Sequence, residues 1–160
     1  MFSSRQKDRD PMFILLLAVS IIWLVLMPLD AVRFHWSQIP LQLQGIGAII
    51  LIAAFALIYL AFRENAYLTP TVRVQEERGH TVVSTGLYRY MRHPMYTGFH
   101  LFFVGTALLL GSAFGFLLAL VLIALFFRRA VLEERVLRKE LPGYDAYMAQ
   151  VNHRFIPYVW

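Results

Sequence analysis

Polar residues that could do chemistry occur at three places in the second half of the chain, and each place borders an apolar segment. They are Arg92, His93, Pro94, Tyr96 and Gly98, then the acidic pair Glu133 and Glu134, and finally Arg154. Guanidinium and imidazole groups bind carboxylates and phosphates, whereas carboxylates bind cations or act as general bases. The pattern predicts a site for a charged ligand at the edge of an apolar region.

Pro94 indicates a local structure for the first group. Proline fits the first turn of a helix and disfavours helical backbone angles at the residue before it, so we expect His93 to cap a helix that begins at Pro94. Exposed amides at a helix start attract anions, and Arg92 would strengthen such an anion site. The alternative for Arg92 and His93 is contact with lipid head groups.

The acidic pair directly follows an apolar segment, which puts it at the same expected depth as the Arg-His-Pro motif. That shared depth allows one common site. The alternative is two surface salt bridges at helical spacing, Glu133 with Arg129 and Glu134 with Arg138.

Two further polar residues have structural alternatives to a role in chemistry. His100 lies one helical turn after Tyr96, inside an apolar segment where a titratable side chain is costly unless it faces protein or a cavity. We expect a core histidine that is hydrogen-bonded to a neighbouring helix. Arg154 has the lipid head groups as its alternative partner.

Composition indicates an integral membrane protein, because 59% of the 160 residues are hydrophobic and only 16% are charged. The absence of cysteine excludes disulfides, thiolate metal sites and a cysteine nucleophile. The net charge of +5 comes from residues between apolar segments, where membrane topology explains them better than nucleic-acid binding does. We therefore expect membrane lipids as neighbours, no nucleic acid and no metal.

Four apolar segments predict an all-α fold of about four transmembrane helices in two hairpins, within one domain of residues 1–160. The predicted spans are residues 12–29, 44–62, 95–110 and 113–132, with a loop at 63–94 and a tail at 133–160 that begins as an amphipathic helix. The last two spans are short, so a partly re-entrant hairpin is the alternative. The first segment is long for a secretory signal and no cleavage site follows it, so we expect it to be retained.

Basic residues predict the orientation in the membrane. They gather before the first span, at Arg5, Lys7 and Arg9, in the central loop, and after Arg128, whereas the first external loop has only Arg33. By the positive-inside rule both termini and the central loop face the cytoplasm. The small size favours the cell membrane of a prokaryote.

The ordered motifs GLYRYMRHPMYTG, LEERVL and PGYDAYMAQVNHRFIP resemble those of the isoprenylcysteine carboxyl methyltransferase family and related membrane phospholipid methyltransferases. The resemblance covers residues 83–157 and implies S-adenosylmethionine as the cofactor. It implies cofactor contacts for Tyr90, Arg92, His93, Pro94, Tyr96, Gly98, Glu133 and Glu134. It also implies catalytic roles for Arg154, Glu133 and His93, with Arg154 near the substrate carboxylate. Leu87 and Tyr158 depart from the family pattern, in which proline and glycine are frequent.

This resemblance predicts methyl transfer to a lipophilic small molecule or lipid, with a prenylcysteine-like carboxylate favoured. Transfer from a sulfonium to a carboxylate removes charge, so a dry site that aligns the reactants favours it. An amine or thiol acceptor would need a base, for which His93, Glu133 and Glu134 are candidates. The acceptor and the oligomeric state are not determined by the sequence.

Two other functions remain open at this point. One is a membrane reductase that uses a nicotinamide cofactor in a related helical scaffold, and the other is a non-enzymatic accessory or transport subunit. The sequence has no phosphate-binding loop and no HExxH motif, and its Gly-x-Gly, at Gly45 and Gly47, lies within a predicted span, where helix packing is expected.

Overall fold

The computed structural model describes residues 10–69 and 74–156, and the described residues contain helices but no strand. The helices are α1 (Pro11–Pro28), its π-helical extension η2 (Leu29–Phe34), α2 (Leu41–Glu64), α3 (Pro94–Leu109), α4 (Ala113–Glu140) and α5 (Tyr144–Gln150), with short 3₁₀ turns η3 (Glu76–Arg78) and η4 (Gly86–Arg89). This confirms the predicted all-α membrane fold. Arg5, Lys7, Arg9 and Tyr158 lie outside the described residues.

Three helices in the described part of the chain are long and apolar enough to cross a membrane: α1 with its extension, α2 and α4. Helix α3 has 16 residues and is shorter than a usual span. The count of four crossings therefore stays a prediction. In α4 the apolar stretch ends at Phe127, and the charged turns from Arg128 to Glu140 continue beyond it.

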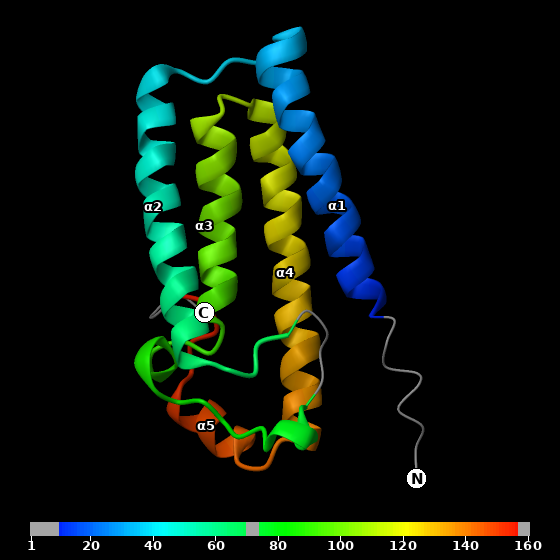
Figure 1. The fold of residues 1–160 in the computed structure, drawn as a ribbon, viewed down its shortest axis with the longest axis vertical. Helices are drawn as coiled ribbons and strands as arrows, with labels where there is room; N and C mark the ends of the chain where they lie inside the picture. The colour runs from blue at the N-terminus through cyan, green and yellow to red at the C-terminus, as the bar shows by residue number, and fades with distance from the viewer. Residues whose placement is uncertain (1–9, 70–73, 157–160) are drawn as a thin grey trace.

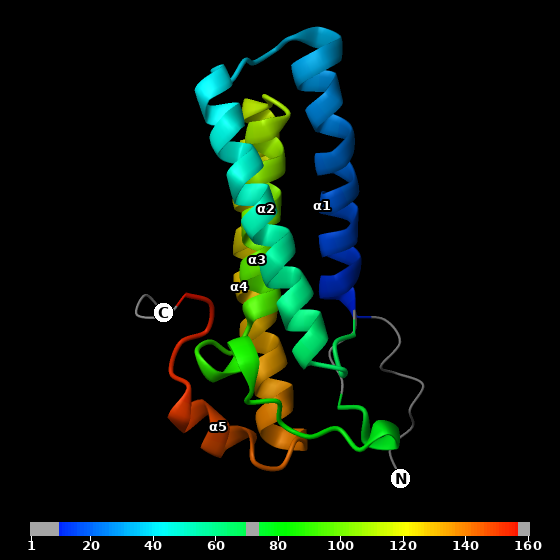
Figure 2. The same cartoon turned by 60° about the vertical axis from the view of Figure 1, so that its left-hand side comes forward.

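The four long helices lie side by side in the order α2, α3, α4, α1 (Figure 1). Both connections, between α1 and α2 and between α3 and α4, lie at one end of the bundle (Figures 1 and 2). The central loop, α5 and the start of α1 lie at the other end, which we call the loop end. Although α1 and α2 are consecutive, α1 packs mainly on α4 and α2 mainly on α3. The two helices of the first predicted hairpin therefore do not pack closely on each other.

Small residues hold α2 close to α3. They are spaced seven residues apart, at Gly47, Ala54 and Ala61 on α2 and at Gly98 and Gly105 on α3. A Cβ on Gly47 would lie 2.6 Å from the backbone nitrogen of Leu109, so no side chain fits there. The packing role expected for Gly47 is confirmed, whereas a Cβ on Gly45 would meet nothing within 4 Å.

At the end opposite the loops, a buried carboxylate holds α1 against α4. Asp30 accepts hydrogen bonds from the hydroxyls of Ser37 and Ser112, at 2.7 and 2.6 Å. Ser112 also caps α4, where its hydroxyl oxygen accepts from the amide of Gly115. Trp23 of α1 donates to the carbonyl of Gly115 at 2.9 Å. These contacts fix one end of α1 on α4.

The C-terminal strip, residues 151–156, lies against the start of α3. The amides of Arg92 and His93 donate to the carbonyls of His153 and Arg154, at 2.9 and 2.8 Å. The hydroxyl of Thr97 donates to the carbonyl of Phe155 at 2.8 Å. The described part of the tail therefore covers the helix ends.

Candidate functional site

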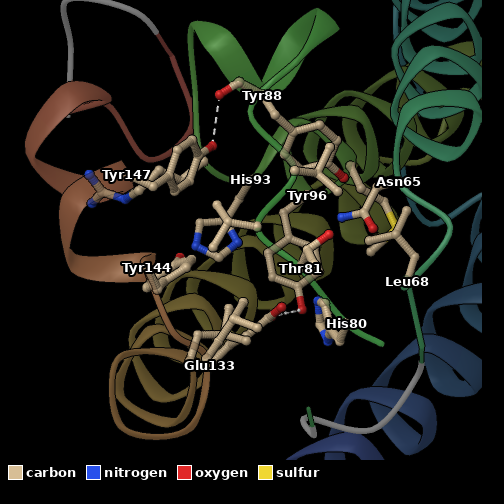
Figure 3. Close-up of a pocket in the computed structure, with 16 residues that line it drawn as sticks. Asn65, Leu68, His80, Thr81, Tyr88, His93, Tyr96, Glu133, Tyr144 and Tyr147 are labelled. Atoms are coloured by element: carbon tan, nitrogen blue, oxygen red, sulfur yellow. Dashed lines mark hydrogen bonds between the residues drawn. The ribbon is translucent and has the colours of Figure 1, made fainter. Parts of the chain in front are cut away.

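A polar cavity of about 60 Å³ lies at the loop end, where the central loop and α5 approach the ends of α3 and α4 (Figure 3). Its lining includes aromatic rings, one carboxylate and the guanidinium of Arg92. The aromatic and acidic residues include Tyr88, His93, Tyr96, Glu133, Tyr144 and Tyr147. A neighbouring cavity of about 70 Å³ shares Asn65, His80, Tyr96 and Glu133, so the two form adjoining parts of one site.

Glu134 holds three segments together behind the cavity. Its Oε1 accepts from Nε of Arg92 at 2.7 Å and lies 3.1 Å from Nε2 of His93, while its Oε2 accepts from Nε of Arg154 at 2.9 Å. Only 4% of its side chain is exposed. Burial opposes ionisation, but the hydrogen bonds to His93, Arg92 and Arg154 outweigh it and lower the pKa of Glu134 to about 2.

These contacts change the expected anion site at the start of α3. His93 precedes the helix as predicted, but its side chain does not cap it. The amides of Arg92 and His93 already donate to the C-terminal strip. The guanidinium of Arg92 also binds Glu134 and the carbonyl of Val151, the latter at 2.7 Å. Arg92 therefore fixes the architecture of the site, and its charge is compensated.

Glu133 faces the cavity instead. The hydroxyl of Tyr96 donates to Oε2 of Glu133 at 2.6 Å (Figure 3). The same hydroxyl accepts from Nε of Arg129 at 3.1 Å, and Nη1 of Arg129 lies 3.1 Å from Oδ2 of Asp10. The surface pairing of Glu134 with Arg138 is wrong, because Arg138 pairs with Asp145 at 2.7 Å.

An apolar groove of about 380 Å³ adjoins the polar cavity and lies between α1 and the other helices. Phe13, Leu16, Leu17 and Ser20 of α1 line it together with Phe62, Phe99, Phe126 and Arg129. Leu68, Met95 and Tyr96 line both the groove and the polar cavity. A polar compartment and an apolar one therefore meet at these three residues, of which Tyr96 carries the polar group.

Comparison with known proteins gives a match to the model of the phospholipid methyltransferase family over residues 43–142. The chain belongs to this family. The matched range contains the Arg-His-Pro motif and the acidic pair, and it ends before Arg154.

Curated proteins that are similar to this chain carry a more specific name than the family does. A probable protein-S-isoprenylcysteine O-methyltransferase of Oryza sativa subsp. indica is 36% identical over 93 residues, covering 57% of this chain and 48% of the relative. The protein-S-isoprenylcysteine O-methyltransferase of Schizosaccharomyces pombe is 40% identical over 67 residues, covering 41% of this chain and 28% of the relative. The matches thus span about half or less of these relatives.

A solved structure has the same fold. It is the eukaryotic intramembrane Ras methyltransferase, isoprenylcysteine carboxyl methyltransferase, which superposes with a TM-score of 0.68 at 23% identity, covering 95% of this chain and 54% of that one. At this identity the likeness shows the fold alone. It supports the all-helical membrane architecture derived above.

Four of the residues expected at the site, Tyr90, Pro94, Gly98 and Arg154, are not among the described residues that line the polar cavity. Tyr90 is exposed, and Gly98 lies on the face of α3 that packs against α2. Pro94 is buried at the helix start. Arg154 binds Glu134 and is not among the residues that line the polar cavity or the groove.

His100 packs among aromatic rings, stacked on Phe127 at 5.2 Å between centroids. Its buried Nε2 has no hydrogen-bond partner in the described structure, so the expected bond from this nitrogen to a neighbouring helix is not formed.

Several contributors to the site were missed from the sequence: His80 in the central loop, Arg129 in α4, and the phenols of Tyr88, Tyr144 and Tyr147. Burial lowers the pKa of His80, and the nearby charge of Glu133 raises it by a smaller amount, so His80 favours its neutral form. Burial raises the pKa of Tyr88 to about 12. It also raises the pKa of Tyr144 and of Tyr147 above the usual value, so the three phenols stay protonated. A charged residue close to an apolar stretch was the available signal for Arg129.

Proposed function

We propose that this protein transfers a methyl group from S-adenosylmethionine to a lipophilic acceptor, at the loop end of the bundle. The observation that carries the proposal is the meeting of a polar cavity and an apolar groove at Leu68, Met95 and Tyr96, of which Tyr96 carries the polar group. A reaction between a charged, water-soluble donor and a lipid-soluble acceptor requires such a junction. The basic residues around the loop end orient it to the cytoplasm by the positive-inside rule.

The donor set of the polar cavity fits the proposed cofactor. When bound, S-adenosylmethionine supplies an electrophilic methyl group on a sulfonium. Electron-rich rings such as those of Tyr88, Tyr144 and Tyr147 attract a cation, and Glu133 accepts from amino or hydroxyl groups. His93 and Tyr96 complete the wall, and the Glu134 contacts hold His93 in place.

The size of the cavity implies a movement. Ligand pockets usually enclose about 300–1,000 Å³, whereas the polar cavity and the cavity that adjoins it enclose about 60 and 70 Å³. Thr81, Val82 and Val83 of the central loop form one wall, opposite Tyr144 and Tyr147 of α5. Cofactor binding therefore requires these two walls to separate. Closure of the walls over the bound cofactor would then exclude water from the reacting groups.

The groove fits the hydrocarbon part of the acceptor. Because α1 does not pack closely on α2, a lipid-soluble chain reaches the groove from the membrane without crossing water. A prenylcysteine-like carboxylate suits it best, since a carboxylate nucleophile needs no base and loses its charge on methylation. A site that holds both reactants in line favours the transfer.

A transfer assay tests this proposal. Detergent-purified protein is incubated with methyl-labelled S-adenosylmethionine and either a prenylated N-acetylcysteine or a phosphatidylethanolamine. The expected product is a base-labile methyl ester on the carboxylate, formed by the native protein and strongly reduced in Glu133→Gln. A base-stable methylamine product would show that the acceptor is a phospholipid amine and not the favoured carboxylate. If folded protein transfers no methyl group to either acceptor, the proposal is contradicted.

A further inference from the structure

Among the described residues that line the apolar groove, one side chain is charged. Eleven of these twelve residues are uncharged, and the twelfth is Arg129. Its side chain is only 5% exposed. A buried guanidinium in apolar surroundings is costly, and such residues usually mark a site for a polar group.

Contacts with Tyr96 and Asp10 help to hold the guanidinium of Arg129 in place. Nε donates to the hydroxyl of Tyr96 at 3.1 Å, and Nη1 lies 3.1 Å from Oδ2 of Asp10. The other oxygen of Asp10 caps α1, accepting from the amides of Met12 and Phe13 at 3.0 and 3.2 Å. The guanidinium is therefore fixed beside the residue that separates the groove from the polar cavity.

The other buried cations of the site are placed differently. Arg92 and Arg154 both bind Glu134, and neither lines the groove. An acceptor whose chain lies along Phe13 and Phe99 would meet Arg129 at the point where its head group reaches Tyr96. The sequence-based expectation gave the acceptor carboxylate to Arg154, but the geometry favours Arg129.

We propose that Arg129 receives the anionic head group of the acceptor and so selects lipophilic oxyanions over neutral lipids. This inference rests on the proposed function and deepens it, since it names a specificity residue for the same site. A guanidinium suits a carboxylate in charge and in planar geometry. An oxyanion held by Arg129 lies beside Tyr96, whose hydroxyl contacts Glu133 in the cofactor cavity.

The rival role for Arg129 is a structural tie between α4 and α1 through Asp10. The two roles predict different effects of one substitution, Asp10→Asn, on the binding of an anionic lipid. Asp10→Asn keeps a side-chain oxygen for the helix cap but removes the negative charge that competes for the guanidinium. Recognition of a head group predicts that this change maintains or strengthens binding of an anion, whereas a structural tie predicts that it weakens binding of every lipid.

The experiment measures binding of two matched lipids, a prenylated N-acetylcysteine and its neutral carboxamide, to detergent-purified full-length protein. We expect the native protein to prefer the carboxylate. Arg129→Gln should weaken carboxylate binding by about tenfold or more and leave carboxamide binding unchanged. Asp10→Asn should bind the carboxylate at least as tightly as the native protein. The double variant Asp10→Asn, Arg129→Gln removes both charges of the pair. It tests whether carboxylate binding is lost when Asp10 is not left as an unpaired charge.

Binding of S-adenosylhomocysteine, measured in parallel, separates the two levels of the account. If the native protein binds it and Arg129→Gln retains the preference for the carboxylate, this inference is overturned while the proposed function stands. Equal weakening of both lipids in all variants would show the structural tie instead. If folded native protein does not bind S-adenosylhomocysteine, the proposed function fails, and this inference fails with it.

Discussion

Arg92 and Glu134 are 42 residues apart in the chain, and their side chains meet in a buried ion pair of 2.7 Å. The pair joins the start of α3 to α4, and Arg154 adds the C-terminal strip. The adjacent Glu133 points about 100° away on the helix, where it lines the polar cavity. Two consecutive carboxylates therefore have different tasks: Glu134 holds the site together, and Glu133 faces the ligand.

This division predicts different effects for matched substitutions. Glu134→Gln leaves Arg92 and Arg154 without their buried counter-charge, so we expect a loss of about 3–5 kcal/mol in unfolding free energy. Glu133→Gln should change stability by about 1 kcal/mol or less but abolish tight cofactor binding. Thermal unfolding in detergent, with cofactor binding measured on the same samples, checks both. Equal stability losses in the two variants would contradict the assignment.

The ion pair also predicts a pH dependence. The pKa of Glu134 is lowered from 4.5 to about 2 in the folded state, so its stabilisation is present above pH 4.5 and is lost as the pH falls toward 2. The difference in stability between native protein and Glu134→Gln should therefore shrink across this window. Chemical unfolding at several pH values measures it, and a difference independent of pH would refute the prediction.

The hydroxyl of Tyr96 joins the two compartments, so its removal should affect transfer more than stability. Tyr96→Phe keeps the ring, which stacks on His93 at 5.3 Å, but takes a hydrogen-bond partner from both Arg129 and Glu133. We expect kcat to fall by up to about 100-fold with little change in melting temperature. Steady-state kinetics on the purified variant provides the measurement, and an unchanged kcat would remove Tyr96 from the reacting geometry.

The close contact of α2 with α3 supplies a test of the fold. Gly47→Ala places a methyl group 2.6 Å from the Leu109 backbone, so the helices must separate, at a cost of about 1–3 kcal/mol. Gly45→Ala is the matched control, since a Cβ there meets nothing within 4 Å. It should change stability by about 1 kcal/mol or less. The two variants unfolding at the same temperature would show that the seam is not close-packed.

Local signals in the sequence were sufficient for the helices. Pro94 marked the start of α3, and long apolar runs marked α1, α2 and α4. The ordered motifs identified the family, which the family match confirms. These features depend on neighbours in the chain, so they can be derived without a structure.

Contacts between distant residues could not be derived in this way. Arg129 and Asp10 are 119 positions apart, and their pairing depends on α1 packing against α4. The anion site expected at His93 was altered by the C-terminal strip, which binds the same amides. The direction of each carboxylate in the acidic pair likewise depends on which helices surround α4.

The most direct test of the account is calorimetric binding of S-adenosylhomocysteine to detergent-purified native protein and to the double variant His93→Ala, Glu133→Ala. Both changes remove groups that line the polar cavity, while Glu134 and its arginine partners remain. The account predicts micromolar binding by the native protein and its loss in the variant. Absence of binding by native protein with a cooperative unfolding transition would contradict it.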